Sequence, residues 1–187
     1  MSEEQLEESE EEKLDENMAC RCPEVYPEEW LGRDMDIAGS CVHKMGIASF
    51  AHMPISYESY LDRQTHNIYE LGLTERWPGL AFTRTGWFGG ENLRFIESAQ
   101  SPSRLVQYLP SPFNVSVRLH EGGVGTVTRT AQRQQSDIIS ARCKPRELYL
   151  AHLSCPVCAE RKGGEKILLM RHWLPSAQLK RRMQKST

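Results

Sequence analysis

The sequence lacks any apolar segment long enough to cross a membrane, and it lacks the start of a secreted protein. No run in the 187 residues approaches the roughly 18 consecutive apolar residues that a transmembrane helix needs. The first residues are acidic, whereas a secretory signal opens with basic residues followed by apolar ones. We therefore expect an intracellular protein, cytoplasmic or nuclear, that does not contact a membrane.

The sequence also lacks the common motifs of phosphate sites and metalloenzymes. Its glycine-rich segment, residues 86–91 (GWFGGE), has neither the P-loop spacing nor the G-x-G-x-x-G spacing. Neither H-E-x-x-H nor H-x-E occurs. We therefore expect a non-enzymatic protein. A small metal- or thiol-dependent enzyme built around Cys41 and His43 is an alternative.

Charge is distributed unevenly, although the whole chain has a net charge of only −2. Residues 1–16 contain nine acidic residues and one lysine, so the rest of the chain is net positive. A segment with many like charges and few apolar residues cannot bury enough surface to order itself. We expect residues 1–17 to form a disordered acidic tail, and residues 18–187 to form a single globular domain.

The six cysteines of the chain are better explained by metal binding than by disulfides. Thiols stay reduced inside the cell, where clustered cysteines commonly bind zinc. Cys155 and Cys158 form a C-x2-C pair, whose thiolates can converge on one ion. The alternatives are a reduced dithiol in a turn and a redox-active pair. The sequence predicts one structural zinc ion in a C-terminal metal-binding module, about residues 143–173.

Zinc prefers four tetrahedral sulfur or nitrogen ligands, so two further ligands are needed. The Gly163-Gly164 pair indicates a hairpin whose second arm would return His172 to Cys155 and Cys158, which makes His172 the next candidate. Cys143 and His152 compete for the remaining position.

Four other residues could form a second metal site nearer the start of the chain. Cys20 and Cys22 form a C-x-C pair, and Cys41 and His43 form a C-x-H pair. The C-x-C spacing is less usual for tetrahedral zinc, and small buried thiols are common, so this second site is an open alternative.

The chain reads as an α+β fold: a single domain rich in antiparallel sheet, with one or two helices and a C-terminal zinc-knuckle hairpin. One helix is expected at residues 57–71, with Ser56 as its N-cap and Gly72 after its end. A basic terminal helix is expected at residues 177–185. Short β-rich runs punctuated by glycine or proline predict strands. These runs are residues 80–85, 93–96, 105–109, 113–119, 124–130 and 137–143.

Two segments are ambiguous and one is expected to be irregular. Residues 37–53 fit either paired strands or an apolar helix, and residues 146–153 fit either a short helix or a strand. Residues 129–135 are polar, and we expect a loop there. The Gly122-Gly123 pair would close a hairpin between two strands.

The function indicated by these features is that of a regulatory or adaptor protein that binds another macromolecule. We expect a protein partner, bound through Trp87 and Phe88 if they are exposed at a hairpin tip. Single-stranded nucleic acid is the alternative partner, because aromatic residues and arginines alternate in the middle of the chain. The residues concerned are Phe82, Arg84, Trp87, Phe88, Arg94, Phe95, Arg118, Arg129 and Arg133.

Overall fold

The computed structural model describes residue 20, residues 22–97 and residues 101–176. It contains an eight-stranded antiparallel sheet, a small two-stranded sheet and three α-helices within these residues. This architecture confirms the predicted α+β class. The elements in chain order are η1 (Glu28–Trp30), β1 (Asp34–Asp36), β2 (Cys41–Ile47), β3 (Ser49–Phe50), β4 (Met53–Pro54), α2 (Tyr57–Glu70), β5 (Phe82–Thr85), β6 (Gly90–Phe95), β7 (Val106–Tyr108), β8 (Asn114–Glu121), η2 (Val124–Thr126), α3 (Val127–Ser140), β9 (Cys143–His152), α4 (Pro156–Ala159) and β10 (Lys166–Pro175).

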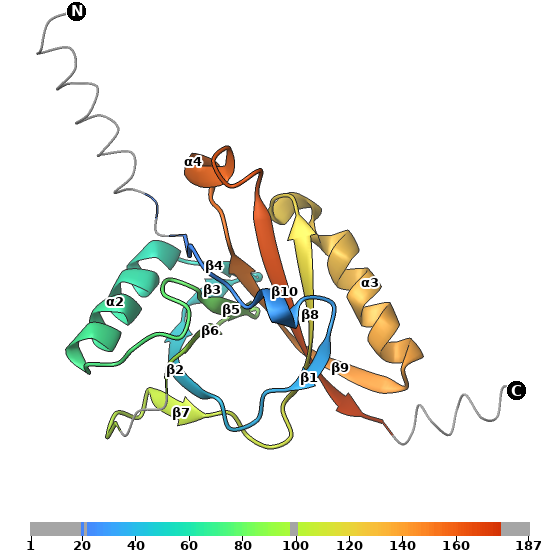
Figure 1. The fold of residues 1–187 in the computed structure, drawn as a ribbon, viewed down its shortest axis with the longest axis horizontal. Coiled ribbons are helices and arrows are strands. Elements are labelled where there is room, and N and C mark those ends of the chain that lie inside the picture. Colours follow the sequence, from blue (N-terminus) through green and yellow to red (C-terminus); the bar gives the residue numbers. More distant parts are fainter. Residues whose placement is uncertain (1–19, 21, 98–100, 177–187) are drawn as a thin grey trace, which may run out of the picture.

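The large sheet contains two βαββ repeats joined at their edges, and β1 and β7 form its outer strands (Figure 1). Its strand order is β1-β8-β10-β9-β5-β6-β2-β7. In the first repeat, β2, α2, β5 and β6 occur in this order, with the β3–β4 hairpin between β2 and α2, and β6 lies between β2 and β5 in the sheet. In the second repeat, β8, α3, β9 and β10 follow one another, and β10 lies between β8 and β9. The repeats meet where β5 pairs with β9 through Thr83 and Leu150.

A buried glutamine occupies the same place in both repeats. Gln64 is the eighth residue of the 14-residue α2, and Gln134 is the eighth residue of the 14-residue α3. The amide of Gln64 donates hydrogen bonds to strand carbonyls of β2 and β6. The amide of Gln134 donates in the same way to β8 and β10. Each glutamine therefore fastens its helix to the first and third strands of its repeat.

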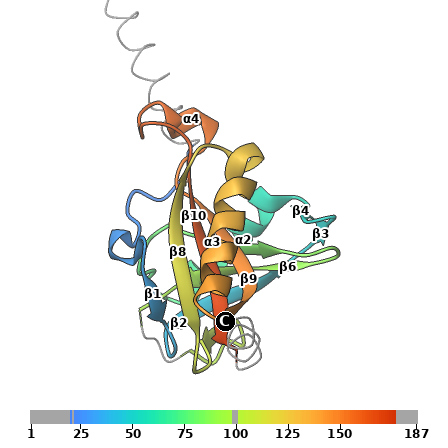
Figure 2. The same cartoon turned by 90° about the vertical axis from the view of Figure 1, so that its right-hand side faces the viewer.

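The two helices cover one face of the sheet, and the main hydrophobic core lies on the other. Side chains alternate along a strand, so neighbouring residues point to opposite faces. On β8, Val115 and Val117 join the main core, whereas Ser116 lies between them and its carbonyl accepts from α3. We call the core side the inner face. Figure 2 shows α3 lying along β8, β9 and β10, in agreement with their packing.

The predicted helix at residues 57–71 is confirmed as α2, which spans Tyr57–Glu70. Gly72 follows its end with a φ of +60°, a conformation that glycine adopts without strain. Ser56 precedes the helix, but its side chain makes no capping hydrogen bond. The strands expected between residues 80 and 119 are present as β5 to β8. The two ambiguous segments are largely strands, since β2 lies within residues 37–53 and β9 contains residues 146–152.

The predictions for residues 124–143 were wrong. The expected strands and loop are instead the short helix η2 and the helix α3, and Cys143 alone belongs to a strand. The face of α3 that packs on the sheet carries Val127, Ala131, Gln134 and Ile138. This spacing is helical, but the glutamine interrupts the apolar stripe that would have indicated a helix. The preceding valines and threonines have strand propensity, which tertiary packing overrides.

The described residues include no helix long and apolar enough to cross a membrane. The predicted acidic tail at residues 1–17 and the predicted basic helix at residues 177–185 lie outside the described residues.

Candidate metal centre

The C-x2-C pair lies in the connection between β9 and β10. Cys155 precedes the short helix α4, and Pro156 occupies its first turn, a position where a missing N–H costs nothing. The backbone N–H of Cys155 donates to the Sγ of Cys158 at 3.3 Å, and the Sγ of Cys155 accepts from the backbone N–H of Cys158. Such N–H donors stabilise negative charge on sulfur. The turn therefore presents both sulfurs to the same side.

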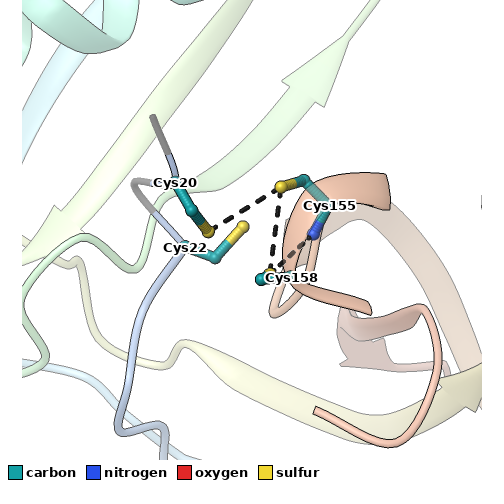
Figure 3. A group of neighbouring side chains, drawn as sticks. All are labelled: Cys20, Cys22, Cys155 and Cys158. Atoms are coloured by element: carbon teal, nitrogen blue, oxygen red, sulfur yellow. Dashed lines mark hydrogen bonds between the residues drawn. The ribbon is translucent and has the colours of Figure 1, made fainter. Parts of the chain in front are cut away.

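The C-x-C pair from the start of the described chain completes a four-sulfur cluster. Figure 3 shows Cys20 and Cys22 on the N-terminal segment facing Cys155 and Cys158 at α4. All four Sγ atoms lie within 4.8 Å of one another. Cys158 is buried, whereas the other three are partly exposed. We call this group the cysteine cluster.

The sulfur spacing of the cysteine cluster fits a tetrahedral metal ion. The Sγ of Cys155 lies 3.7 Å from that of Cys20 and 3.8 Å from that of Cys158. Zinc–thiolate bonds of about 2.3 Å at tetrahedral angles place neighbouring sulfurs about 3.8 Å apart. A disulfide would instead require about 2.05 Å, and all four cysteines are free thiols. The cluster could therefore hold one metal ion.

The electrostatics of the cluster favour the thiolate of Cys155 and disfavour those of Cys20 and Cys22. Burial raises the pKa of the Cys155 thiol, but hydrogen bonds from the Cys158 backbone and the Cys20 thiol outweigh burial and lower this pKa to about 7. Burial raises the pKa values of Cys20 and Cys22, and the neighbouring thiols add to the rise. A bound divalent cation removes this conflict, because it deprotonates coordinating thiols outright.

The cysteine-bearing N-terminal segment is docked on the β9–β10 connection. We call residue 20 and residues 22–33 the strap. The Lys162 ammonium donates to the carbonyl oxygens of Pro23 at 2.6 Å and Leu153 at 3.3 Å. Glu24 pairs with Arg161 at 3.3 Å and with Lys162 at 3.6 Å. Exposed ion pairs contribute little stability, so these contacts by themselves hold the strap weakly.

Further along, the strap is fixed by Trp30 in the main core. Trp30 is 5% exposed, and its ring packs edge-on against Trp77 at 4.9 Å and Phe95 at 5.4 Å between ring centroids. Beyond it, the backbone N–H of Gly32 donates to the carbonyl of Val117 in β8. The strap therefore joins the cysteine cluster to the first repeat through Trp30 and to the second repeat through β8.

Of the five predicted ligands, the structure brings only Cys155 and Cys158 into the cluster. His172 lies six residues beyond the start of β10, about 20 Å along the strand at about 3.3 Å per residue. There its Nδ1 lies 2.9 Å from a carboxylate oxygen of Glu147, and its ring stacks on Phe113. β10 runs away from Cys155 and Cys158, so it cannot bring His172 back to them. The prediction from the Gly163-Gly164 pair did not take this strand direction into account.

The other two predicted ligands lie on β9. Cys143 begins this strand opposite Pro175, nine residues and about 30 Å from the knuckle end. His152 ends the strand next to the knuckle, but its side chain is exposed and shares the helix-covered face with Leu148 and Leu150.

The residues of the hypothetical second site are divided between two places. Cys20 and Cys22 belong to the cysteine cluster, whereas Cys41 and His43 lie on β2. His43 is fully buried, and its Nδ1 lies 3.2 Å from the amide nitrogen of Gln64. A catalytic pair at Cys41 and His43 would have no access to substrate through this histidine. The sequence signal that was missed is the number of paired cysteines, since the C-x-C pair and the C-x2-C pair together supply four ligands.

A cavity of about 310 Å³ opens on the inner face, where the two repeats meet. Glu91 lines this cavity and accepts a 2.6 Å hydrogen bond from the Tyr149 hydroxyl. Glu91 also pairs with Lys44 at 2.6 Å and Arg84 at 3.3 Å. Burial raises the pKa of Glu91, but these partners outweigh burial and lower it, so the carboxylate is ionised at neutral pH. We call this cavity the inter-repeat cleft. The Glu147–His172 pair also lines it.

A second surface feature is formed by the turn between β5 and β6 and the β3–β4 hairpin. Trp87 is 62% exposed and Phe88 is 83% exposed, as expected for a hairpin that presents two aromatic side chains. The Phe88 ring lies 6.4 Å from that of Phe50, which is also exposed. The backbone of Ala51 donates to the carbonyl of Trp87, which holds the two turns together. We call Phe50, Met53, Trp87 and Phe88 the aromatic tip.

Three other residues of the aromatic and arginine set are buried and unavailable to nucleic acid. Phe82 and Phe95 are core residues. Arg94 is buried and its guanidinium pairs with Glu75 at 3.0 Å. Among the described aromatic residues of that set, Trp87 and Phe88 are the exposed ones.

Comparison with known proteins gives matches in structure alone. No protein-family model and no curated protein matches the sequence. The EcmrR C-terminal domain is similar in structure, with a TM-score of 0.57 and 9% sequence identity over 76% of this chain and 96% of that domain. EcmrR in an EcmrR–DNA complex matches with a TM-score of 0.52 and 8% identity over 76% of this chain but 56% of that protein. The chain therefore has the fold of the EcmrR C-terminal domain, and at this identity the likeness extends to the fold alone.

Proposed function

We propose that this chain is a non-enzymatic regulatory protein whose binding fold is closed by a structural zinc ion at Cys20, Cys22, Cys155 and Cys158. The observation that carries this proposal is the spacing of the sulfurs, which matches a tetrahedral zinc–thiolate site and not a disulfide. Thiolate sulfur is a soft ligand that selects zinc over magnesium, calcium or manganese.

The role of this ion is structural and not catalytic. Four protein ligands complete the coordination of zinc, whereas a catalytic zinc keeps one position open for water or substrate. The ligands come from two segments 135 residues apart in sequence. The ion therefore ties the start of the strap to the β9–β10 connection, a link that the exposed ion pairs around Glu24 supply only weakly.

The protein partner of this fold binds through the aromatic tip. Large exposed aromatic side chains contribute strongly to interfaces, because they bury much area at a low cost in side-chain entropy. Nucleic acid is the alternative partner. Its support is that EcmrR, whose C-terminal domain has this fold, forms a complex with DNA. Against it, two of the four aromatic residues expected to stack on bases, Phe82 and Phe95, are in the core.

The zinc proposal is tested by the metal content of the full chain. Protein purified without chelators from a zinc-supplemented medium should contain about one zinc per chain, since one tetrahedral site uses all four thiolates. Elemental analysis measures this ratio, and a thiol titration before and after chelation should reveal four newly reactive cysteines. A metal-free protein with unchanged thermal stability would contradict the proposal.

A second candidate function is the binding of a small organic molecule in the inter-repeat cleft. The specific observation is that a cavity of about 310 Å³ lies at the junction of the two repeats and contains an ionised, buried carboxylate among aromatic and aliphatic side chains. Concave sites with a few convergent polar groups are typical of ligand pockets. With such a ligand, the regulatory protein would act as a sensor of a small molecule bound in the inter-repeat cleft.

The cleft is tested by a fragment screen read out by thermal shift. A ligand that raises the melting temperature of the native chain should lose at least about tenfold in affinity in Tyr149→Phe. This variant removes the hydroxyl that orients Glu91. A hydrogen bond to a charged group contributes about 1.5 to 3 kcal/mol, and about 1.4 kcal/mol corresponds to tenfold in affinity. Tyr108→Phe is the matched control, because Tyr108 also lines the cleft but its side chain is 58% exposed. Equal losses in both variants would argue against binding around Glu91.

A further inference from the structure

We propose that the cysteine cluster is a redox-sensitive clasp for the strap. A hydroperoxide oxidises Cys155 and Cys158 to a disulfide, the zinc ion leaves, and the start of the strap loses its anchor. This inference rests on the zinc site proposed above.

Within the C-x2-C pair, exposure selects the first thiolate to react. Cys155 is partly exposed, whereas Cys158 is 3% exposed. Accessible thiolates are the ones that peroxides oxidise. In the first step the Cys155 sulfur attacks one oxygen of the peroxide and the O–O bond breaks. The sulfur becomes a sulfenic acid, and hydroxide leaves when the oxidant is hydrogen peroxide.

In the second step the Cys158 thiolate attacks the Cys155 sulfur, 3.8 Å away in the present structure, and a second hydroxide leaves. Two thiolates have then lost two electrons, and one hydrogen peroxide has been reduced to two hydroxide ions. The remaining ligands, Cys20 and Cys22, are two of the four that a structural zinc site needs, so zinc dissociates.

Cys20 lies as close to Cys155 as Cys158 does, so distance alone does not choose the disulfide partner. Cys158 and Cys20 differ in how firmly each sulfur is positioned once the metal–sulfur bonds weaken. Cys155 and Cys158 belong to one helical turn, and their hydrogen bonds run between backbone and sulfur within that turn. The position of Cys20 depends instead on the weak contacts of the strap around Glu24. The C-x2-C pair therefore keeps the higher effective concentration.

The strap is released only as far as its next anchor. Without the metal, the start of the strap is held only by the contacts of Pro23 and Glu24 with the β9–β10 connection, which are too weak to keep it docked. Trp30 stays in the main core, since none of its ring contacts involves the cluster. Oxidation should therefore free residues 22–27 and leave β1 paired with β8.

The experiment adds hydrogen peroxide to the zinc-loaded full chain. Zinc release is followed with a colorimetric chelator, disulfides are mapped by mass spectrometry, and hydrogen exchange is compared between residues 22–27 and β1. We expect about one zinc released per Cys155–Cys158 disulfide, on the one-ion argument. Exchange at residues 22–27 should accelerate at least about tenfold while β1 is unchanged. Dithiothreitol with added zinc should reverse all three signals.

Cys143→Ser is the control variant, because Cys143 is partly exposed but lies at the far end of β9. It should release zinc at the native rate. Zinc that stays bound during peroxide treatment, release without a disulfide, or a Cys20–Cys155 disulfide that keeps the strap attached would each overturn the clasp. A chain that contains no zinc at the outset would instead refute the proposed function.

Discussion

Cys20→Ser should abolish zinc binding as completely as Cys155→Ser does, although the two residues are 135 positions apart. A serine hydroxyl does not replace a thiolate on zinc, and three remaining ligands leave the site open. With zinc present at about 1,000 times its dissociation constant, metal binding contributes about 4 kcal/mol to the stability of the folded state. Its loss should lower the melting temperature by about 8 to 16 °C in a chain of this size.

Elemental analysis and thermal denaturation, with and without chelator, measure this effect. Chelator should lower the melting temperature of the native chain to that of the variants, and it should leave the variants unchanged. Cys143→Ser is the matched control and should behave like the native chain. If Cys20→Ser retained zinc while Cys155→Ser lost it, the strap would not be part of the metal site.

The second large effect is expected for Trp30→Ala, which removes the internal anchor of the strap. Trp30 is 5% exposed and contacts two other aromatic rings in the main core. Truncating a buried tryptophan to alanine costs about 3 to 5 kcal/mol, since it loses both transfer energy and packing. The midpoint of urea denaturation should fall accordingly.

Trp87→Ala provides the comparison, because Trp87 is 62% exposed at the aromatic tip. Its stability should change by no more than about 0.5 kcal/mol, as is usual for surface positions. The same variant should weaken binding of a protein partner if the aromatic tip is the interface. A similar loss of stability in both variants would contradict the assignment of Trp30 as the core anchor.

Local patterns in the sequence identified the elements whose stabilising interactions are also local. Alternation along residues 113–119 predicted β8, and an apolar stripe with a following glycine predicted α2. The C-x2-C spacing picked out Cys155 and Cys158, because one turn of backbone brings the two sulfurs together. In each case the residues that indicate the feature lie within a few positions of one another.

The errors arose where a distant contact decides the structure. Gln134 faces the sheet from α3, and only the carbonyls of β8 and β10 satisfy its amide. In the sequence, the same glutamine interrupts the apolar stripe that would have indicated the helix α3. His172 was expected at the knuckle, but strand pairing carries it to the cleft beside Glu147. Register is set by the whole sheet, so a hairpin argument from two glycines could not place it.

The sequence by itself determined that this chain has an α+β fold rich in antiparallel sheet, and that a cysteine pair near its end suits a metal. Only the tertiary structure decided which residues complete the cluster. Cys20 and Cys22 reach Cys155 and Cys158 because Trp30 is buried against the first repeat and the strap crosses to the β9–β10 connection. Spacing specifies ligands within one turn, whereas ligands on separate segments are specified by the packing that brings those segments together.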